Sequence, residues 1–184
     1  MTKEKNQGPL KGLTVLDLTR VLAGPYATMV LSDLGARIIK VEPPMGDDSR
    51  EFSPFIDEQS AYFASLNREK ESIKIDLKDK KDKIIFDALL EKSDILIENY
   101  KPGTMAKLGY GYEKLSKKFP NLIYASCSGF GQTGPWASKP AYDMIVQGMG
   151  GLMSVTGHEG EEPVRVGTSI GDITAGLFTA IGIN

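Results

Sequence analysis

Cysteine and histidine are nearly absent from this sequence, since each occurs once, as Cys127 and His158. A single cysteine excludes an internal disulfide, and without further thiols or imidazoles the usual ligands of a zinc site are missing. We therefore expect no bound metal and no permanently bound cofactor. The same scarcity leaves no readable Ser–His or Cys–His pair, and Cys127, with no histidine near it in sequence, is better interpreted as a small buried side chain.

Neither sign of charge is in large excess, because 22 lysines and arginines stand against 24 aspartates and glutamates. This balance argues against a general electrostatic attraction to nucleic acid or to an anionic membrane. Long apolar runs are also missing: none approaches the roughly 18 residues that cross a bilayer, and the polar start MTKEKNQGPLKG has no signal-peptide core. We expect a cytoplasmic protein whose 184 residues form one domain.

Strand and helix patterns alternate along the chain. Short β-branched and aliphatic runs at residues 14–19, 37–42, 72–77, 95–100 and 122–130 predict five strands. Helical spacing at residues 24–35, ending on a capping glycine, and at 78–93 predicts helices between them, and residues 45–59 are typical of a polar loop. The alternation predicts an α/β fold with a Rossmann-like parallel sheet flanked by helices.

Glycine is scarce where a dinucleotide-binding protein would need it. Glu42 ends the second predicted strand, where an acid that binds ribose would lie. After the first strand, however, the chain reads RVLAGPYAT, with one glycine and a proline in place of G-x-G-x-x-G. The sequence therefore disfavours a nicotinamide-dependent oxidoreductase, although a parallel sheet still favours a ligand at the carboxyl ends of its strands.

Four stretches together carry a family resemblance. They are LKGLTVLDLTRVLAGPYATMVLSDLGARIIKVEPPMGDDSR, ENYKPGTMAKLGYGYEKL, YASCSGFGQTGPWASKPAYDMIVQGMGGLMSVTG and GDITAG. In combination they resemble the class III CoA-transferases, a family that includes formyl-CoA and carnitine CoA-transferases and α-methylacyl-CoA racemases. The resemblance runs from about residue 10 to the last residue and implies the amino-terminal part of a fold that forms an interlocked homodimer. It also implies that the carboxyl half is absent from these residues.

The resemblance assigns the family's aspartate nucleophile to Asp172, in GDITAG. The chemistry agrees, because a carboxylate with an ordinary pKa of about 3.9 is ionised at neutral pH and can attack a thioester without a general base. Attack on an acyl-CoA implies an aspartyl anhydride and then an aspartyl-CoA thioester, which a carboxylic acid acceptor resolves. Spacing alone favours a simpler interpretation, in which Asp172 is a residue of a helix N-terminus stabilised by the helix dipole.

A CoA-binding groove is also implied by the resemblance. Its residues would be Leu22, Ala23, Ile75, Leu77, Lys78, Asn99, Tyr100, Lys101, Lys107 and Tyr142. NYKPG followed by Lys107 suits a phosphate physically, although the same residues would also form an ordinary turn with a solvated lysine. Lys107 replaces an arginine that is common there, which keeps the charge and loses the bidentate fork.

Two alternatives to a transferase remain open at this point. Racemases of the family carry a histidine at the position of Tyr142, and a phenol with a pKa near 10 is a poor base at neutral pH. The second alternative is an inactive fragment that at most binds CoA. Leu22 stands where formyl-CoA transferases have a polar glutamine, which disfavours formyl transfer and leaves the acyl donor and the acceptor acid open.

Overall fold

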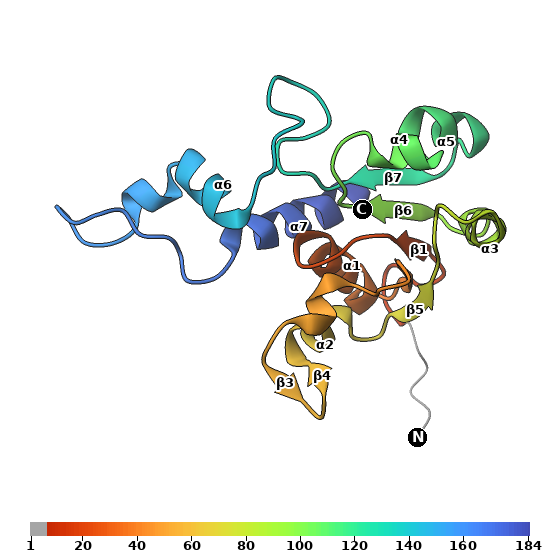
Figure 1. Ribbon diagram of the computed structural model, residues 1–184, viewed down its shortest axis with the longest axis horizontal. Coiled ribbons are helices and arrows are strands. Elements are labelled where there is room, and N and C mark those ends of the chain that lie inside the picture. Colours follow the sequence, from red (N-terminus) through yellow and green to blue (C-terminus); the bar gives the residue numbers. More distant parts are fainter. Residues whose placement is uncertain (1–6) are drawn as a thin grey trace.

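The computed structural model describes residues 7–184 and contains a five-stranded sheet (Figure 1). In chain order the strands are β1 (Thr14–Asp17), β2 (Arg37–Glu42), β5 (Glu71–Lys74), β6 (Ile95–Glu98) and β7 (Ile123–Ser126). All neighbouring pairs are parallel, in the spatial order β5-β2-β1-β6-β7, and Val15 of the central strand is in register with Ile38 and Ile95. The predicted α/β fold with a Rossmann-like sheet is confirmed.

Seven helices are described along these residues. They are α1 (Ala23–Asp33), α2 (Ala61–Asn67), α3 (Lys80–Leu90), α4 (Thr104–Leu108), α5 (Tyr112–Lys118), α6 (Asp143–Met149) and α7 (Ile170–Ile183), with 3-10 turns η1 (Asp48–Glu51) and η2 (Leu152–Val155). α1 ends just before Gly35, whose φ of 103° supplies the left-handed turn expected of a capping glycine. Asp79 caps α3 by accepting from the backbone N–H of Lys81 and Asp82.

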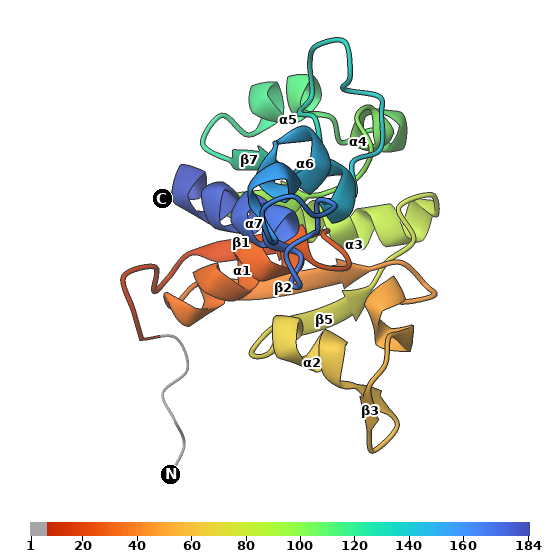
Figure 2. The same ribbon diagram turned by 90° about the vertical axis from the view of Figure 1, so that its left-hand side faces the viewer.

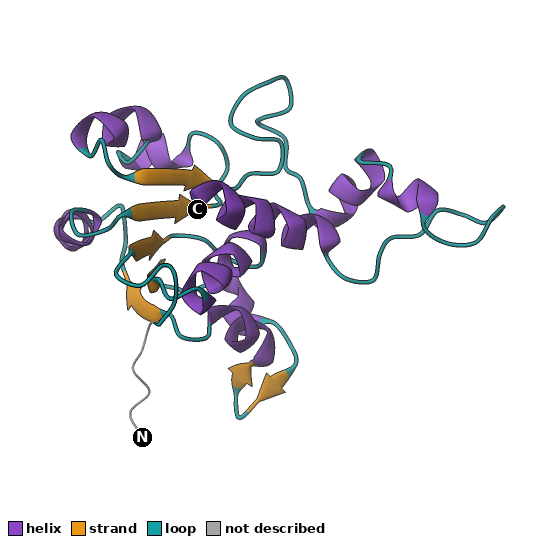
Figure 3. Ribbon diagram, turned by 180° about the vertical axis from the view of Figure 1, so that it is seen from behind, coloured by secondary structure: helices purple, strands orange, loops and turns teal. Residues whose placement is uncertain are grey.

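Helices cover both faces of the sheet, as expected for alternating buried strand residues. On one face, Leu16 and Leu96 pack with Phe86 of α3 and Leu115 of α5. On the other face lies a second cluster, comprising Val15, Ala27, Leu31, Ala36, Ile38, Ile95, Ile97 and Ala180. Consecutive residues of a strand, such as Val15 and Leu16, thus point to opposite faces of the sheet and pack in different clusters. The second cluster joins the sheet to α1 and α7, which run side by side across it (Figures 2 and 3).

The contact between α1 and α7 depends on one glycine of α7. A Cβ at Gly176 would lie 2.5 Å from the carbonyl oxygen of Ala23 and 3.2 Å from the ring of Tyr26. Only the missing side chain allows the two helix backbones to approach so closely. α7, at 14 residues, is the longest of the described helices, and within residues 7–184 no helix is long and apolar enough to cross a membrane.

We expect Gly176→Ala to lower the free energy of unfolding by about 1–3 kcal/mol, because a backbone atom blocks the added methyl. Gly182→Ala is the matched control: it lies on the same helix, and a Cβ added there would meet no atom within 4 Å, so it should stabilise the helix by up to about 1 kcal/mol. Urea unfolding of the two variants measures this. Equal effects of the two substitutions would contradict the close packing of α1 and α7.

Some predicted elements differ in extent from those observed. β1, β5, β6 and β7 are each shorter than the predicted strands, at 4 residues apiece, and β7 ends well before the predicted residue 130. The predicted polar loop at residues 45–59 contains η1 and the small antiparallel pair β3 (Phe55–Ile56) and β4 (Gln59–Ser60). α6 and the loops around it project away from the sheet, as Figures 1 and 3 show.

Candidate active site around Asp172

Asp172 lies in the first turn of α7, and a neighbouring carboxylate fixes that turn. Ser169, the residue before the helix, provides no side-chain cap. Instead, Oδ1 of Asp143 accepts from the backbone N–H of Gly171 at 2.8 Å, while its Oδ2 accepts from Nε2 of Gln147 at 2.7 Å. A Cβ at Gly171 would lie 3.1 Å from Oδ1 of Asp143. The residue beside Asp172 is therefore held tightly against α6.

The environment of Asp172 raises the pKa of its carboxyl. Partial burial is the largest cause, and the nearby carboxylate of Asp143 adds to it by repulsion. Both causes act in the same direction and disfavour the ionised form of Asp172 in the folded protein. A carboxylate with a raised pKa is a stronger base and a better nucleophile once it is ionised.

Asp172 faces a cavity of about 280 Å³ that contains six of the predicted site residues. Asp172, Ala23, Asn99, Tyr100, Lys101 and Tyr142 all line it. They come from α7, from the start of α1, from the turn after β6 and from the residue before α6. The cavity thus lies outside the carboxyl ends of β1 and β6, where ligands bind in open parallel sheets.

Three further predicted residues line a neighbouring cavity of about 140 Å³. Ile75, Leu77 and Lys78 form it together with Tyr100, which also lines the Asp172 cavity. A third cavity, about 490 Å³, shares Lys101 with the Asp172 cavity and extends toward α4 and β7. The turn at residues 99–101 therefore contributes to the walls of all three cavities. Burial of Tyr100, which belongs to this turn, raises the pKa of its hydroxyl.

Two predicted groove residues lie apart from these cavities. Leu22 is half-buried directly before α1, and Lys107 is exposed in the last turn of α4; neither lines the three hollows among the described residues. His158 is exposed in the loop after η2 and does not line them either. Tyr142, by contrast, lies at the cavity mouth with 75% of its surface exposed.

Cys127 also lines the Asp172 cavity but is poorly suited to attack a substrate. Its burial raises the pKa of the thiol; a hydrogen bond with Thr179 lowers it, and the charge of Asp172 raises it again. Thiolate, rather than thiol, is the reactive form. Within this cavity the ionised carboxylate of Asp172 is therefore the better placed nucleophile.

Asp47 is a supporting residue that the sequence patterns did not single out, whereas Arg20 was predicted only as one of the residues at the carboxyl end of the first strand, where a parallel sheet favours a ligand. Arg20 lines the Asp172 cavity. Its backbone N–H donates to Oδ1 of Asn99 at 2.9 Å, and its backbone carbonyl accepts from Nδ2 of Asn99 at 2.8 Å. The next residue, Val21, has a φ of 68°, a left-handed conformation that is strained for a β-branched residue. Its N–H donates to Oδ1 of Asp47 at 3.2 Å. The place of Arg20 directly after β1 was the one sequence signal that pointed to it.

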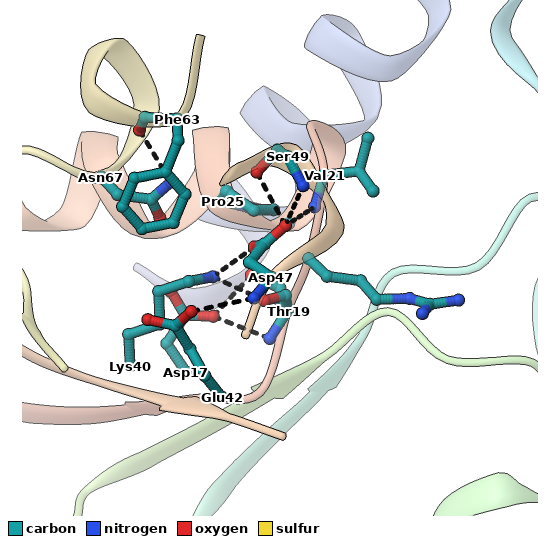
Figure 4. Close-up of polar contacts among 12 residues, drawn as sticks. Asp17, Thr19, Val21, Pro25, Lys40, Glu42, Asp47, Ser49, Phe63 and Asn67 are labelled. Atoms are coloured by element: carbon teal, nitrogen blue, oxygen red, sulfur yellow. Dashed lines mark hydrogen bonds and ion pairs between the residues drawn. The ribbon is translucent and has the colours of Figure 1, made fainter. Parts of the chain in front are cut away.

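A buried ion pair supports Asp47 from the sheet (Figure 4). Nζ of Lys40 lies 2.8 Å from Oδ2 of Asp47 and donates to the carbonyl of Thr19, also at 2.8 Å, and both charged side chains are 1% exposed. Glu42, next along the same face of β2, is equally buried, and both its oxygens accept from Arg50. Glu42 thus anchors η1 and is not free to bind a ribose.

Comparisons with known proteins identify the family of the chain. The family model described as CoA-transferase family III matches residues 10–184. The chain is 54% identical to an acetyl-CoA:oxalate CoA-transferase of Acetobacter aceti over 99% of its length, and 49% identical to a succinyl-CoA:glutarate CoA-transferase of Mus musculus over 92%. It covers 47% and 39% of those two proteins, so it spans less than half the length of these curated relatives.

A solved structure shows the same fold at high similarity. The crystal structure of a CAIB/BAIF family protein from Brucella suis matches with a TM-score of 0.91 and 43% identity, covering 97% of this chain and 48% of that protein. At this identity the likeness extends to sequence as well as to fold. The chain belongs to CoA-transferase family III.

Proposed function

We propose that the protein moves CoA from an acyl-CoA donor to a short dicarboxylic acid, with Asp172 as the nucleophile. The observation that carries this proposal is the placement of Asp172, with a raised pKa, in a cavity that also contains the predicted CoA-contacting residues. The similar proteins of Acetobacter aceti and Mus musculus are named for transfer to oxalate and between succinyl-CoA and glutarate. These acids are short dicarboxylates, which fits a cavity of about 280 Å³.

The reaction needs a nucleophile but no net proton transfer. The Asp172 carboxylate attacks the thioester carbonyl, the C–S bond breaks, and CoA leaves as a thiolate, which gives a mixed anhydride. The thiolate then attacks the aspartyl carbonyl, releases the donor acid as a carboxylate and leaves CoA bound to Asp172 as a thioester. The acceptor carboxylate reverses these two steps and regenerates Asp172. Partial burial of Asp172 helps to keep water from both activated intermediates.

CoA is proposed to extend from Asp172 past the turn at residues 99–101. Tyr100 is common to the Asp172 cavity and to the cavity of Ile75, Leu77 and Lys78, so one extended ligand fits along both. The apolar side chains of this second cavity suit adenine or the pantetheine arm, and Lys78 suits a phosphate. Leu22 and Lys107, which line neither of these two cavities, are proposed to contact CoA outside them, and the whole protein is proposed to act as a homodimer.

Racemase chemistry has weaker support in this site. Inversion at carbon requires a base on one face and an acid on the other. Tyr142 occupies the cavity mouth where racemases of the family carry histidine, and His158 lies in a loop outside the cavity. The position of these two residues supports the proposal of a nucleophile, Asp172, without a second proton carrier.

The direct test supplies succinyl-CoA or acetyl-CoA with oxalate or glutarate and follows the products by mass spectrometry. The proposal predicts formation of the acceptor's CoA thioester at the rate at which the donor acid is released. Deuterium from heavy water at the α-carbon of a branched acyl-CoA, with no CoA transfer to any acid, would identify a racemase and contradict the proposal.

Lys107→Ala is expected to weaken CoA binding by roughly 1–2 kcal/mol, and more at low salt than at high salt, because Lys107 is proposed to contact a phosphate. Lys117→Ala is the control, since Lys117 is also exposed and lies in the last turn of α5, outside the proposed path. Calorimetric titration with CoA at two ionic strengths measures both variants. If Lys107→Ala and the unmodified protein bound CoA with equal affinity, Lys107 would be a solvated turn residue that does not contact CoA.

A further inference from the structure

We propose that Arg20 binds the remote carboxylate of the dicarboxylic substrate while the other carboxyl group reacts at Asp172. This inference rests on the proposed function and assigns to one residue the choice between dicarboxylic and monocarboxylic acids. Three cations, Arg20, Lys101 and Lys139, line the Asp172 cavity together with one carboxylate, that of Asp172.

The excess of cations in this cavity calls for an anion other than the phosphates of CoA. Those phosphates lie at the far end of the pantetheine arm, whereas this cavity of about 280 Å³ surrounds the reacting group itself. A dicarboxylic acid that reacts through one carboxyl group carries its other charge into the same confined space. A carboxylate removed from water in this way requires a cationic, hydrogen-bonding partner.

Arg20 is the cation with the most rigid support. The amide of Asn99 binds both its N–H and its carbonyl, and Asp47 holds the strained backbone of Val21 directly after it. Figure 4 shows Asp47 between Lys40 of the sheet and the N–H of Val21. Because strained backbone persists only where its surroundings enforce it, Asn99 and Asp47 act as positioning residues for Arg20.

The other two cations are less suitable for this role. Lys101 also lines the larger cavity near α4, and Nζ of Lys139 lies 5.2 Å from the ring centroid of Trp136, on the loop before α6. An arginine also offers a planar pair of donors that matches a carboxylate in a bidentate fashion, which a lysine does not.

The guanidinium of Arg20 is available for a substrate. Its NH1 lies 3.0 Å from Oδ2 of Asp48, and the two side chains are 53% and 58% exposed. An exposed pair of this kind contributes at most about 1 kcal/mol, so a substrate carboxylate that Arg20 binds through two guanidinium nitrogens competes with it. Asp48 therefore serves as a partner for Arg20 that the substrate displaces.

The test compares glutarate with pentanoate, an acid of the same length with one carboxyl group, as CoA acceptors. Arg20→Met should lower kcat/KM for glutarate by about 10–100-fold, the loss of a bidentate charged contact, and change that for pentanoate by less than about threefold. Arg20→Lys, which keeps the charge and loses the fork, should fall between. Asp48→Asn, which removes only the exposed partner, should retain or improve the preference for glutarate.

The ratio of the two acids separates specificity from damage to the fold. Damage would lower activity with both acids equally, so an unchanged glutarate-to-pentanoate ratio in Arg20→Met would overturn this inference and leave the proposed function intact. No transfer to any acid by the unmodified protein would contradict the proposed function instead. In that case the equilibrium affinities of the same variants for glutarate and pentanoate still test the role of Arg20. A loss of affinity for glutarate alone in Arg20→Met supports this role, and an unchanged affinity for glutarate overturns it.

Discussion

Asp172→Asn is expected to lower the rate of CoA transfer by several orders of magnitude. The amide has nearly the same shape as the carboxylate, but it cannot form the anhydride or the thioester through which the proposed reaction passes. Initial rates with saturating donor and acceptor, compared with those of the unmodified protein, measure the effect. A variant that transfers CoA at near the original rate would contradict the covalent mechanism.

The fold should tolerate this substitution. Burial and Asp143 raise the pKa of Asp172, so the ionised form is disfavoured in the folded state, and a neutral amide should leave the midpoint of thermal unfolding unchanged or raise it. Because the pKa of Asp172 is raised, its reactive carboxylate is protonated at a higher pH than that of an ordinary aspartate. The rate of transfer by the unmodified protein should therefore begin to fall at a pH above the ordinary aspartate pKa as the solution is acidified. Loss of activity together with loss of folding would indicate a structural role for Asp172 instead.

Lys40→Met is expected to reduce the free energy of unfolding by about 3–5 kcal/mol, because it leaves the buried carboxylate of Asp47 without its counter-ion. Burial acts to raise the pKa of Asp47, and Lys40 together with Ser49 holds it below its ordinary value. The substitution also frees the carbonyl of Thr19, to which Lys40 now donates. Urea unfolding monitored by circular dichroism gives the size of the loss.

Arg37→Met, on the same strand β2, is the matched control. Arg37 forms a two-point contact with Glu71, yet both side chains are about half exposed, so its loss should cost no more than about 1 kcal/mol. If the two variants lost similar stability, the Lys40–Asp47 pair would not be the support of the strained Val21 segment that the geometry indicates. Lys40→Met should also reduce the preference for glutarate, because Arg20 lies next to that segment.

The existence of the five strands and the parallel character of the sheet could be predicted from local patterns, whereas the spatial order of the strands could not. The apolar residues of β6 (ILIE) and the β-branched and aliphatic residues of β2 (RIIKVE) mark these two strands, and Gly35, with its positive φ, marks the end of α1. The edge strand β5 was overextended because Ile75 and Leu77 continue its alternation: they are buried, yet they lie beyond the paired residues. Hydrophobic alternation reports burial, whereas strand ends depend on a neighbour that the pattern does not reveal.

The candidate site was predictable where a motif was continuous and not where it was assembled in space. Asp172 and the turn at residues 99–101 stand in recognisable stretches, and the structure brings them to one cavity. Asp47 was read as part of a polar loop, because nothing in its local sequence shows that it lies against Lys40 and Val21. The bond between Asn99 and Arg20 joins residues 79 positions apart, beyond the reach of any local pattern.

The central claim, that Asp172 becomes covalently linked during transfer, is tested most directly by trapping. The protein is incubated with an acyl-CoA donor in the absence of acceptor, treated with hydroxylamine, digested and analysed by mass spectrometry. We expect a hydroxamate at Asp172 that depends on the donor and is absent from Asp172→Asn. Transfer of CoA that proceeds with Asp172 unlabelled, or with the label on another residue such as Cys127, would contradict it.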